Sequence, residues 1–463
     1  MIKSESHVVE EPTHTHSNSN AVHTPAEKAG LYSWYVVLLC MVAYIFSFID
    51  RQILALMIEP IKADLHISDT QFSLLHGLAF SLFYAFMGLP LAYIADRFSR
   101  PKLIAIGIVF WSVATVACGL SKNFIHLFLS RMGVGVGEAA LSPAAYSMFS
   151  DMFSKEKLGR AVAVYSIGSF VGGGIAFLVG GYIIGLLKDM TLISVPVFGM
   201  LKPWQLAFVI VGLPGVFIGL LVLLTVKDPK RKGQKVDANG QVAKVSLKDT
   251  FAFLGKHRKT FTCHYLGFTF YAMALYCIIS WAPAFYIRKF GLTPTEAGYM
   301  LGTVLLVANC LGVWVAGWMN DHYIKKGRKD APMLVGVIGI AGLVIPMMTF
   351  THTDSLVLSV VLLVPAMFFA SFPMPISTTA MQMLAPNQLR AQISAIFLLI
   401  SNLVAVGIGT TLVALITDKV FTNPAMVGSS LTIVGTVACV LTFILLQLGC
   451  KAFRNSMESE YKN

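Results

Sequence analysis

Two charged residues lie inside an apolar stretch of this sequence, where charge is costly. Arg131 and Glu138 belong to the run 124–149, which is long and apolar enough to be a membrane span. With Gly135 between them, they are spaced so that on a helix both side chains share one face, about 10 Å apart along the axis. A charge near the bilayer centre costs about 2.5–3.5 kcal/mol on insertion scales, so an ionisable residue there indicates a function. A carboxylate can carry a proton at that depth, and a guanidinium can bind an anion.

A second acid–base pair, Asp50 and Arg51, lies in the first apolar run. Asp50 precedes Pro60 by ten residues, which places it about 15 Å from the outer end of a helix. Glu138 lies at a similar or slightly greater depth on a run of opposite direction, and Arg131 lies nearer the outside. We therefore predict that the four charges, which sum to zero, form one layer near the middle of the bilayer.

These residue types suit the coupling of a proton to an anionic substrate. Asp50 and Glu138 are the predicted proton sites, because their protonation responds to hydration and to the neighbouring arginines. Arg51 and Arg131 stay charged and can bind a phosphate or carboxylate in a bidentate way. A substrate on the arginines would leave the carboxylates without partners and favour their protonation. The alternative is a static network that only holds two helices together.

The composition indicates a membrane protein. Of the 463 residues 56% are hydrophobic and only 13% are charged, against about 25% in soluble domains. We expect an all-α membrane protein with twelve transmembrane helices, and no enzyme activity, cofactor or metal site. The predicted spans are 33–58, 72–95, 102–120, 124–149, 160–187, 204–226, 261–287, 296–319, 332–351, 355–380, 391–417 and 427–449.

A basic, polar segment divides the spans six and six. Most Lys and Arg residues fall in the tails, in this linker and in loops on the same side of the predicted membrane, so we expect both termini in the cytoplasm. This placement explains the net charge of +12 without nucleic acid. The predicted regions are a disordered cytoplasmic tail (1–30), a six-helix bundle (31–226), the cytoplasmic linker (227–260), a second six-helix bundle (261–450) and a cytoplasmic tail (451–463).

The two halves of the chain repeat a pattern. Asp96 follows the second span and Asp321 the eighth, 225 residues later; Arg160 precedes the fifth span and Arg390 the eleventh, 230 residues later. Matching positions at a nearly constant offset indicate a duplicated six-helix unit, as in transporters built from two parallel repeats. The spans of the second half offer no acid–base set, only neutral polar residues such as Asn309 and Asn402.

The chain resembles the major facilitator superfamily over residues 31–450. The motif after span 2, from Gly88 through Asp96-Arg97 to Arg100, is a variant of that superfamily's signature, with Ala92 and Ser99 in place of two glycines. Other stretches resemble bacterial spinster-like transporters, whose animal relatives export sphingosine phosphate or lysophospholipids. They are Ser47-Phe-Ile-Asp50-Arg51, Glu59-Pro-Ile-Lys-Ala-Asp, Arg131 to Glu138 with Ser142-Pro143, and Val211-Gly-Leu-Pro-Gly. The charged residues of spans 1 and 4 are also similar to those of anion:cation symporters, which move sugar acids with protons.

The resemblance implies a cytoplasmic gate that is closed in the outward-facing state. In that gate Asp96 would lie near span 11 and Asp321 near span 5. The basic residues expected around them are Arg97, Arg100, Arg160 and Arg390. The alternative is a basic loop with incidental acidic residues. For His76, near the outer end of span 2, a pH-sensing role and a helix-end role both remain open.

We therefore predict a proton-coupled secondary active transporter that works by alternating access in the cell inner membrane. The substrate that we favour is an anionic amphiphile, such as a lysolipid or a sphingosine phosphate-like lipid, because aromatic residues of the second half can form an apolar wall opposite the charges. These residues are Phe268, Phe270, Tyr271, Tyr276, Trp281, Met374 and Phe397. The alternatives are a proton-coupled symporter of small organic anions and a non-transporting receptor on the same fold. The expected partners are the substrate, protons and the lipid bilayer, with no nucleic acid, and the protein is expected to be a monomer.

Overall fold

The computed structural model describes residues 30–95, 97–231, 247–386 and 388–461. Twelve helices in these ranges are long and apolar enough to cross a membrane, which confirms the predicted all-α membrane fold. The predicted tail at 1–30 lies outside the described residues except for Gly30, and so does the middle of the predicted linker. The two strands among the described residues, β1 (Ile193–Val195) and β2 (Gly199–Leu201), pair antiparallel in one short hairpin.

In the described part of the first half there are nine α-helices and one π-helix. They are α1 (Leu31–Leu56), α2 (Ile58–Leu65), α3 (Asp69–Ser73), η1 (Leu74–Leu78), α4 (Ala79–Ala95), α5 (Arg100–Gly119), α6 (Phe124–Glu138), α7 (Leu141–Met152), α8 (Lys155–Leu187) and α9 (Pro203–Thr225). Some of the predicted spans are not single α-helices. Span 2 passes from α3 through the π-helix η1 into α4, and span 4 consists of α6 and α7 with a backbone turn between them.

The second half follows the same plan, with more π-helical turns. Its elements are α10 (Leu247–Lys256), α11 (Arg258–Phe290), α12 (Pro294–Val304), η2 (Leu305–Asn309), α13 (Cys310–Lys325), α14 (Ala331–Thr349), α15 (Leu356–Ala370), α16 (Pro373–Leu384), α17 (Arg390–Ser401), η3 (Asn402–Gly409), α18 (Thr410–Leu415), η4 (Ile416–Phe421), η5 (Pro424–Met426) and α19 (Val427–Tyr461). The π-helices η2, η3 and η4 lie in spans 8 and 11.

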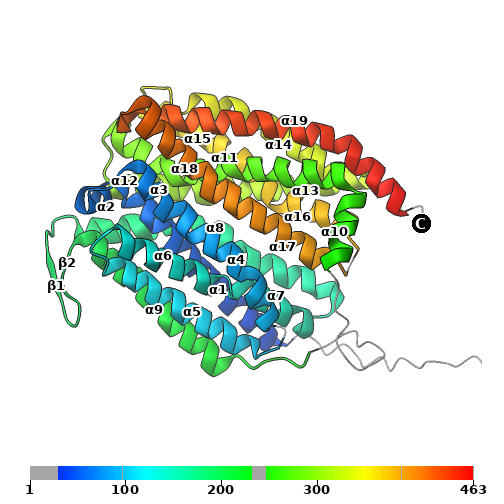
Figure 1. Cartoon of the computed structure of the whole chain (residues 1–463), viewed down its shortest axis with the longest axis horizontal. Helices are drawn as coiled ribbons and strands as arrows, with labels where there is room; N and C mark the ends of the chain where they lie inside the picture. The colour runs from blue at the N-terminus through cyan, green and yellow to red at the C-terminus, as the bar shows by residue number, and fades with distance from the viewer. Residues whose placement is uncertain (1–29, 96, 232–246, 387, 462–463) are drawn as a thin grey trace, which may run out of the picture.

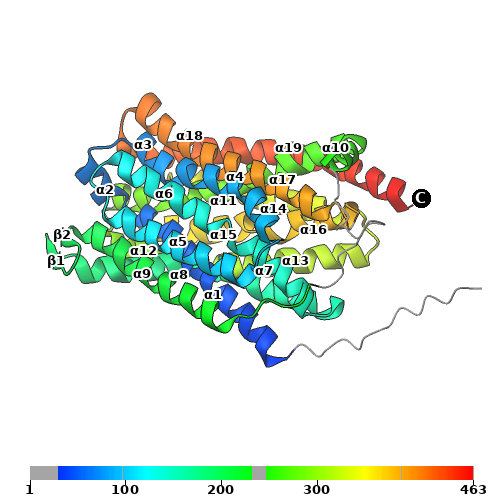
Figure 2. The same ribbon diagram turned by 60° about the horizontal axis from the view of Figure 1, so that its bottom comes forward.

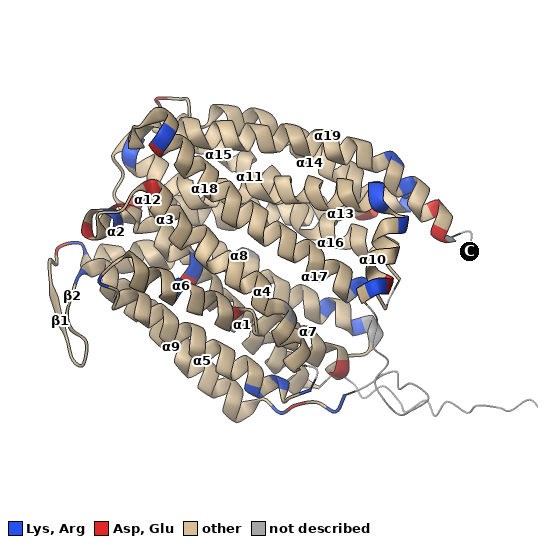
Figure 3. Ribbon diagram, in the orientation of Figure 1, with Lys and Arg blue, Asp and Glu red and all other residues tan. Residues whose placement is uncertain are grey.

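The long helices run roughly side by side between two ends of the molecule (Figure 1). The hairpin end carries β1, β2 and α2, and the linker end carries α10 and the C-terminal part of α19 (Figures 1 and 2). The helices of each half pack mainly with one another, and the halves meet through α8 with α12, α4 with η3, and α3 with α18. Charged side chains gather at the two ends, and few lie along the middle of the bundle (Figure 3).

The helices of the first half approach one another closely where glycine removes a side chain. A Cβ added at Gly135 of α6 would lie 2.5 Å from the Phe80 carbonyl oxygen of α4. A Cβ at Gly137 would lie 2.7 Å from the Trp111 backbone nitrogen of α5. Small residues of this kind permit close helix packing in membranes, as expected for the glycine-rich stretch of span 4.

Helix α19 continues from the last span through most of the predicted tail to Tyr461, and ion pairs hold its last turns. Arg454 bonds to Asp330 at 2.8 Å, and Glu460 bonds to Lys256 of α10 at 2.6 Å. Burial alone would raise the pKa of Asp330, but hydrogen bonds from Arg328 and Arg454 hold this pKa below its usual value.

Replacing Gly135 with Ala should destabilise the first half, because the added methyl group overlaps the Phe80 carbonyl group. Overpacking of this kind typically costs about 1–3 kcal/mol. Gly88→Ala in α4 is the matched control, since nothing lies within 4 Å of its added Cβ. Thermal unfolding of the purified protein in detergent should show a lower melting temperature for Gly135→Ala only. Equal melting temperatures for the two variants would contradict this packing.

Candidate functional site

An ion pair joins α1 to the end of α6 in the middle of the first half. The Arg51 Nε atom donates to Glu138 Oε2 at 2.6 Å, and Nη2 of the same guanidinium also contacts this oxygen. The Ser47 hydroxyl, one helical turn before Arg51, also donates to Glu138 Oε2 at 2.6 Å. Glu138 is 3% exposed, so this carboxylate depends on the two α1 side chains instead of on water.

The backbone of span 4 explains the position of Glu138. Helix α6 ends at this residue, and the chain makes a turn at Ala139 and Ala140 before α7 begins at Leu141. The glycines that precede it bring α6 against α4 and α5. The carboxylate therefore lies at a break in a membrane-spanning segment, on the part of α6 that neighbouring helices approach most closely.

The other two predicted charges do not pair through their charged groups. Arg131 donates from Nη1 to the backbone carbonyl oxygen of Asp50 at 3.1 Å. Among the described residues, Asp50 Oδ1 and Arg131 Nε have no hydrogen-bond partner, although both residues are at most 2% exposed. The predicted four-charge layer thus consists of one ion pair, Arg51 with Glu138, and two buried groups linked through the backbone.

Aromatic rings separate the two guanidinium groups. The Arg51 guanidinium carbon lies 4.4 Å from the centre of the Phe80 ring, 5.0 Å from Phe48 and 5.1 Å from Tyr84. Arg131 lies 5.7 Å from the centre of the same Phe80 ring. Cation–π contacts in a dry environment stabilise both charges. The side chain of Arg51 remains 15% exposed, whereas Arg131 is 1% exposed, so Arg51 is the more accessible of the two.

A cavity lies between the halves, lined on one side by the Phe48 ring against which Arg51 packs. Its wall includes Phe48 and Gln52, which flank Arg51 on α1, and none of the lining residues is charged. The other lining residues are Ser169, Gly173, Leu275, Tyr276, Ile279, Leu305, Asn309, Ser371 and Met374.

The predicted aromatic wall is mostly part of the protein core. Of that set, Tyr276 and Met374 line the cavity. Phe268 and Tyr271 are fully buried, and the Trp281 indole donates to the Thr410 carbonyl oxygen at 2.9 Å within the second half. The expectation of an aromatic wall across the cavity was therefore wrong for most of these residues, which do not line it.

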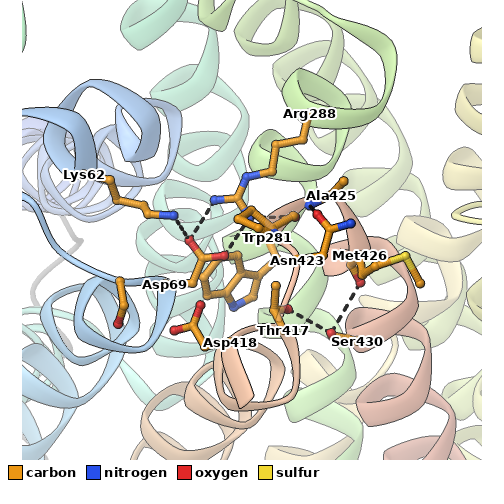
Figure 4. Close-up of polar contacts among 12 residues, drawn as sticks. Lys62, Asp69, Trp281, Arg288, Thr417, Asp418, Asn423, Ala425, Met426 and Ser430 are labelled. Atoms are coloured by element: carbon orange, nitrogen blue, oxygen red, sulfur yellow. Dashed lines mark hydrogen bonds and ion pairs between the residues drawn. The ribbon is translucent and has the colours of Figure 1, made fainter. Parts of the chain in front are cut away.

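A second group of charges connects the halves at the hairpin end. We call Glu59, Lys62, Asp69 and Arg288 the hairpin-end cluster. Arg288 of α11 donates two hydrogen bonds of 2.7 Å to the two carboxylate oxygens of Asp69 (Figure 4). It donates a third hydrogen bond of 2.7 Å to Glu59. Lys62 also binds Asp69, which is fully buried. Among the described residues, every ion pair between the halves involves Arg288.

A neighbouring contact strengthens the same interface. Asp418 of η4 accepts hydrogen bonds of 2.7 Å from both the backbone nitrogen and the hydroxyl of Thr70. A carboxylate at this position caps the N-terminal turn of α3 from the opposite half of the chain. Beneath it, the Phe72 ring meets Trp281 edge to face, with 6.4 Å between the ring centres.

The residues of the predicted gate at the linker end do not form such a cluster. Asp96 lies outside the described residues. Three other residues of this gate are exposed, namely Asp321, Arg160 and Arg390. Arg390 Nε donates to the Ala385 carbonyl oxygen at 3.0 Å. The described part of the chain therefore brings neither Arg160 nor Arg390 to Asp321.

The two remaining arginines of the predicted gate bind within the first half. Arg97 lies over the Tyr93 ring at 3.9 Å. Arg100 is 1% exposed and binds Asp151 of α7 and Asp228 at the start of the linker. In this structure Arg100 thus ties the linker to α5 and α7.

His76 lies in η1 and is 7% exposed. Neither ring nitrogen has a hydrogen-bond partner among the described residues, so His76 is not a helix-end histidine whose hydrogen bonds are satisfied. Its ring stacks near Phe72, with 6.3 Å between the ring centres.

Sequence reasoning missed the hairpin-end cluster. Its signal was available as charged residues at the outer ends of three predicted spans, and Lys62 and Arg288 were noted only as basic residues of the outer loops. Asp69 and Arg288 are 219 residues apart in sequence, and neither is part of the repeated motif, so nothing in the spacing indicates that they meet.

Comparisons with known proteins agree with the resemblance predicted from sequence. A model of the Major Facilitator Superfamily matches residues 40–410. A bacterial homologue of the human lysosomal transporter spinster, solved in an inward-facing and unoccupied conformation, superposes with a TM-score of 0.74 at 26% identity, covering 93% of this chain and 98% of that one.

Two relatives with curated names represent the two predicted branches. Protein spinster of Drosophila melanogaster is 24% identical over 323 residues, covering 68% of this chain and 50% of its own length. This chain thus spans about half the length of that protein. The probable galactarate/D-glucarate transporter GudP of Bacillus subtilis is 25% identical over 384 residues, covering 75% of this chain and 78% of its own length.

Removing the charge of Asp69 should loosen the hairpin end, because Asp69→Asn cannot accept the bidentate pair from Arg288. Breaking a buried ion pair typically costs about 3–5 kcal/mol. A loss of only about 1.4 kcal/mol already changes an equilibrium constant, here between the closed and open hairpin end, ten-fold. A Phe72→Cys reporter in a cysteine-free background should therefore react with a water-soluble maleimide at least about ten-fold faster.

The matched control is Asp64→Asn. Asp64 also lies at the hairpin end and binds Lys202 and Trp204, but all three residues belong to the first half. This variant should leave the labelling rate of Phe72→Cys unchanged. Equal rates in the Asp69 and Asp64 variants would show that the cluster does not hold the halves together.

Proposed function

Because the chain belongs to the Major Facilitator Superfamily, we propose that it is a proton-coupled secondary active transporter of organic anions that works by alternating access. The observation that carries this proposal is the Arg51–Glu138 ion pair, which is buried in the middle of the first half and lies beside the Phe48 ring that lines the cavity between the halves. One member of this pair can bind a proton, and the other can bind an anion.

The two ligands are linked through competition for Arg51. A carboxylate or phosphate of the substrate can take the hydrogen bonds that Arg51 now gives to Glu138, and a planar guanidinium suits such an anion. Glu138 then lacks its cationic partner in a place that is nearly closed to water, which favours its protonation. The Ser47 hydroxyl remains beside the carboxyl group in either state.

Asp50 is proposed as a second proton site, with Arg131 as its positioning partner. Arg131 holds the backbone of Asp50, and the buried Asp50 Oδ1 has no partner among the described residues. A buried carboxylate oxygen without a partner at this depth is costly, so a proton on Asp50 would relieve part of that cost. Arg131 becomes a candidate for substrate binding only if Phe80 moves away from it.

Alternating access requires that one end is closed while the other is open. The hairpin-end cluster and Asp418 join the halves at one end, whereas Asp321, Arg160 and Arg390 are exposed at the other. The excess of Lys and Arg at the linker end supports a cytoplasmic position for that end and for both termini in the cell inner membrane. We infer an inward-facing state, in which the hairpin-end cluster is the closed outer gate.

The substrate class has two candidates. An anionic amphiphile, such as a lysolipid or a sphingosine phosphate-like lipid, is supported by the similarity to spinster proteins. A small organic anion is supported by the similarity to a probable galactarate/D-glucarate transporter. The position of most of the aromatic set in the core removes the main sequence argument for the amphiphile, and the polar part of the cavity wall favours the second candidate.

Replacement of the proposed proton carriers should uncouple the protein without unfolding it. In proteoliposomes, Glu138→Gln and Asp50→Asn should abolish substrate uptake driven by a pH gradient, because an amide cannot carry the proton. Exchange of labelled for unlabelled substrate, which needs no net proton movement, should continue in at least one of the two variants.

Glu296→Gln provides the control, since this exposed glutamate only completes the N-terminal capping box of α12, and glutamine can do the same. Its gradient-driven uptake should equal that of the unmodified protein. If uptake in both Glu138→Gln and Asp50→Asn kept its full dependence on the pH gradient, the proposed coupling would be wrong.

A further inference from the structure

The cavity between the halves presents hydrogen-bond acceptors to whatever occupies it. Gln52 of α1 and Asn309 of η2 line it from opposite halves and are 5% and 9% exposed. Among the described residues, neither Gln52 Oε1 nor Asn309 Oδ1 has a hydrogen-bond partner. A buried amide oxygen without a partner is unfavourable, and the two residues that carry such oxygens both belong to the wall of one cavity, which makes them candidates for contact with a ligand that supplies the missing donors.

The two serines in the wall can also only accept. The Ser169 hydroxyl donates to the Ser166 carbonyl oxygen at 2.8 Å, and the Ser371 hydroxyl donates to the Phe368 carbonyl oxygen at 2.8 Å. Each hydroxyl hydrogen is thereby used, and the oxygen keeps lone pairs for a further bond. The first half thus contributes one amide and one serine to the wall, and the second half contributes the same pair of groups.

The local backbone supports a ligand site at Asn309. Leu305 and Asn309, the first and last residues of η2, both line the cavity. π-Helical turns inside α-helices are rare and are frequently found at functional sites. Asn402, the other neutral polar residue singled out in the second half, lies in η3 and donates to the Leu398 carbonyl oxygen at 2.8 Å, and it does not line the cavity.

The charge of the surroundings decides which donor fits. A hydroxyl group and an ammonium group both donate hydrogen bonds. No lining residue is acidic, and the Glu138 carboxylate is paired with Arg51. Phe48 lies one helical turn before both Arg51 and Gln52 on α1, and the Arg51 guanidinium carbon is 5.0 Å from the centre of the Phe48 ring, so a cation in this cavity would lie near a positive charge. A neutral hydroxyl avoids this repulsion and can also accept a bond from the amide nitrogens.

We propose that Gln52 and Asn309 form a subsite for the hydroxyl groups of an anion, with Ser169 and Ser371 as additional acceptors. The proposal rests on the proposed function in that Arg51 holds the anionic end of the same molecule. A ligand hydroxyl that bonds to both amides would join α1 to η2, and would therefore draw the two halves together around the substrate. The shared chemistry is an anion that carries hydroxyl groups, and it can come from a free hydroxy acid or from the glycerol of a lysophospholipid.

Matched pairs of probes test this subsite at equilibrium. D-Gluconate and hexanoate have the same chain length and carboxylate but differ in their hydroxyl groups. Oleoyl lysophosphatidate and its 2-deoxy analogue differ in the same way for a lipid. Binding to the full-length protein in detergent, measured by calorimetry, should be at least about ten-fold tighter for the hydroxylated member of one pair, and that pair identifies the source of the ligand.

The variants Asn309→Leu and Gln52→Leu should lose this preference, while binding of the hydroxyl-free probe stays the same or improves. Asn402→Leu is the matched control and should keep the preference. Two cavity variants on different helices are used, so that a folding defect in one, detected by thermal unfolding, leaves the other informative.

Three outcomes would overturn the subsite. They are equal binding of both members in each pair, a full preference retained in both cavity variants, and failure of the unmodified protein to bind either hydroxylated probe. The measurement uses no pH gradient, so it is independent of proton coupling. If uptake in Glu138→Gln and Asp50→Asn kept its full dependence on the pH gradient while the hydroxyl preference was intact, the proposed transport mechanism would be rejected and the subsite would stand.

Discussion

The ion pair between Arg51 and Glu138 is the interaction on which the central part of the structure depends. Two charges buried in a membrane protein are tolerable only while each satisfies the other, since an unpaired charge at this depth is expensive. The pairing requires α6 to end at Glu138, α1 to present Arg51 at the same depth, and glycines to let the helices approach. Aromatic rings around Arg51 complete the enclosure. Any change at this pair therefore changes the energy of the whole region.

The hairpin-end cluster gives the protein a second electrostatic contact with a different consequence. The central pair lies within the first half, so it can exchange partners without moving one half against the other. Arg288 and Asp69 belong to different halves, so their bond holds only while the hairpin end is closed. Bidentate geometry makes such a bond sensitive to small displacements. The protein thus separates ligand chemistry from the contact that senses the relative position of the halves.

The second half contributes neutral chemistry to the cavity. Its lining residues are apolar, aromatic or uncharged polar, and its amide at Asn309 lies on a π-helical turn. The first half adds a charge, Arg51, which packs against the lining residue Phe48, and the described part of the second half has no such charge beside the cavity wall. This difference contrasts with the repeated helix pattern of the two halves.

The sequence by itself determined the membrane class, the twelve spans and the glycines that allow close packing. These features follow from composition and from the helical repeat, which are local properties of the chain. It did not determine which residues each charged or aromatic side chain contacts. Arg131 binds the Asp50 backbone, Arg100 binds Asp151 and Asp228, and most of the aromatic residues expected at the cavity do not line it. Helical periodicity specifies which side chains share a face, whereas the neighbour of that face depends on how distant helices rotate and pack. For that reason only the tertiary structure brought Glu138 to Arg51 and Asp69 to Arg288.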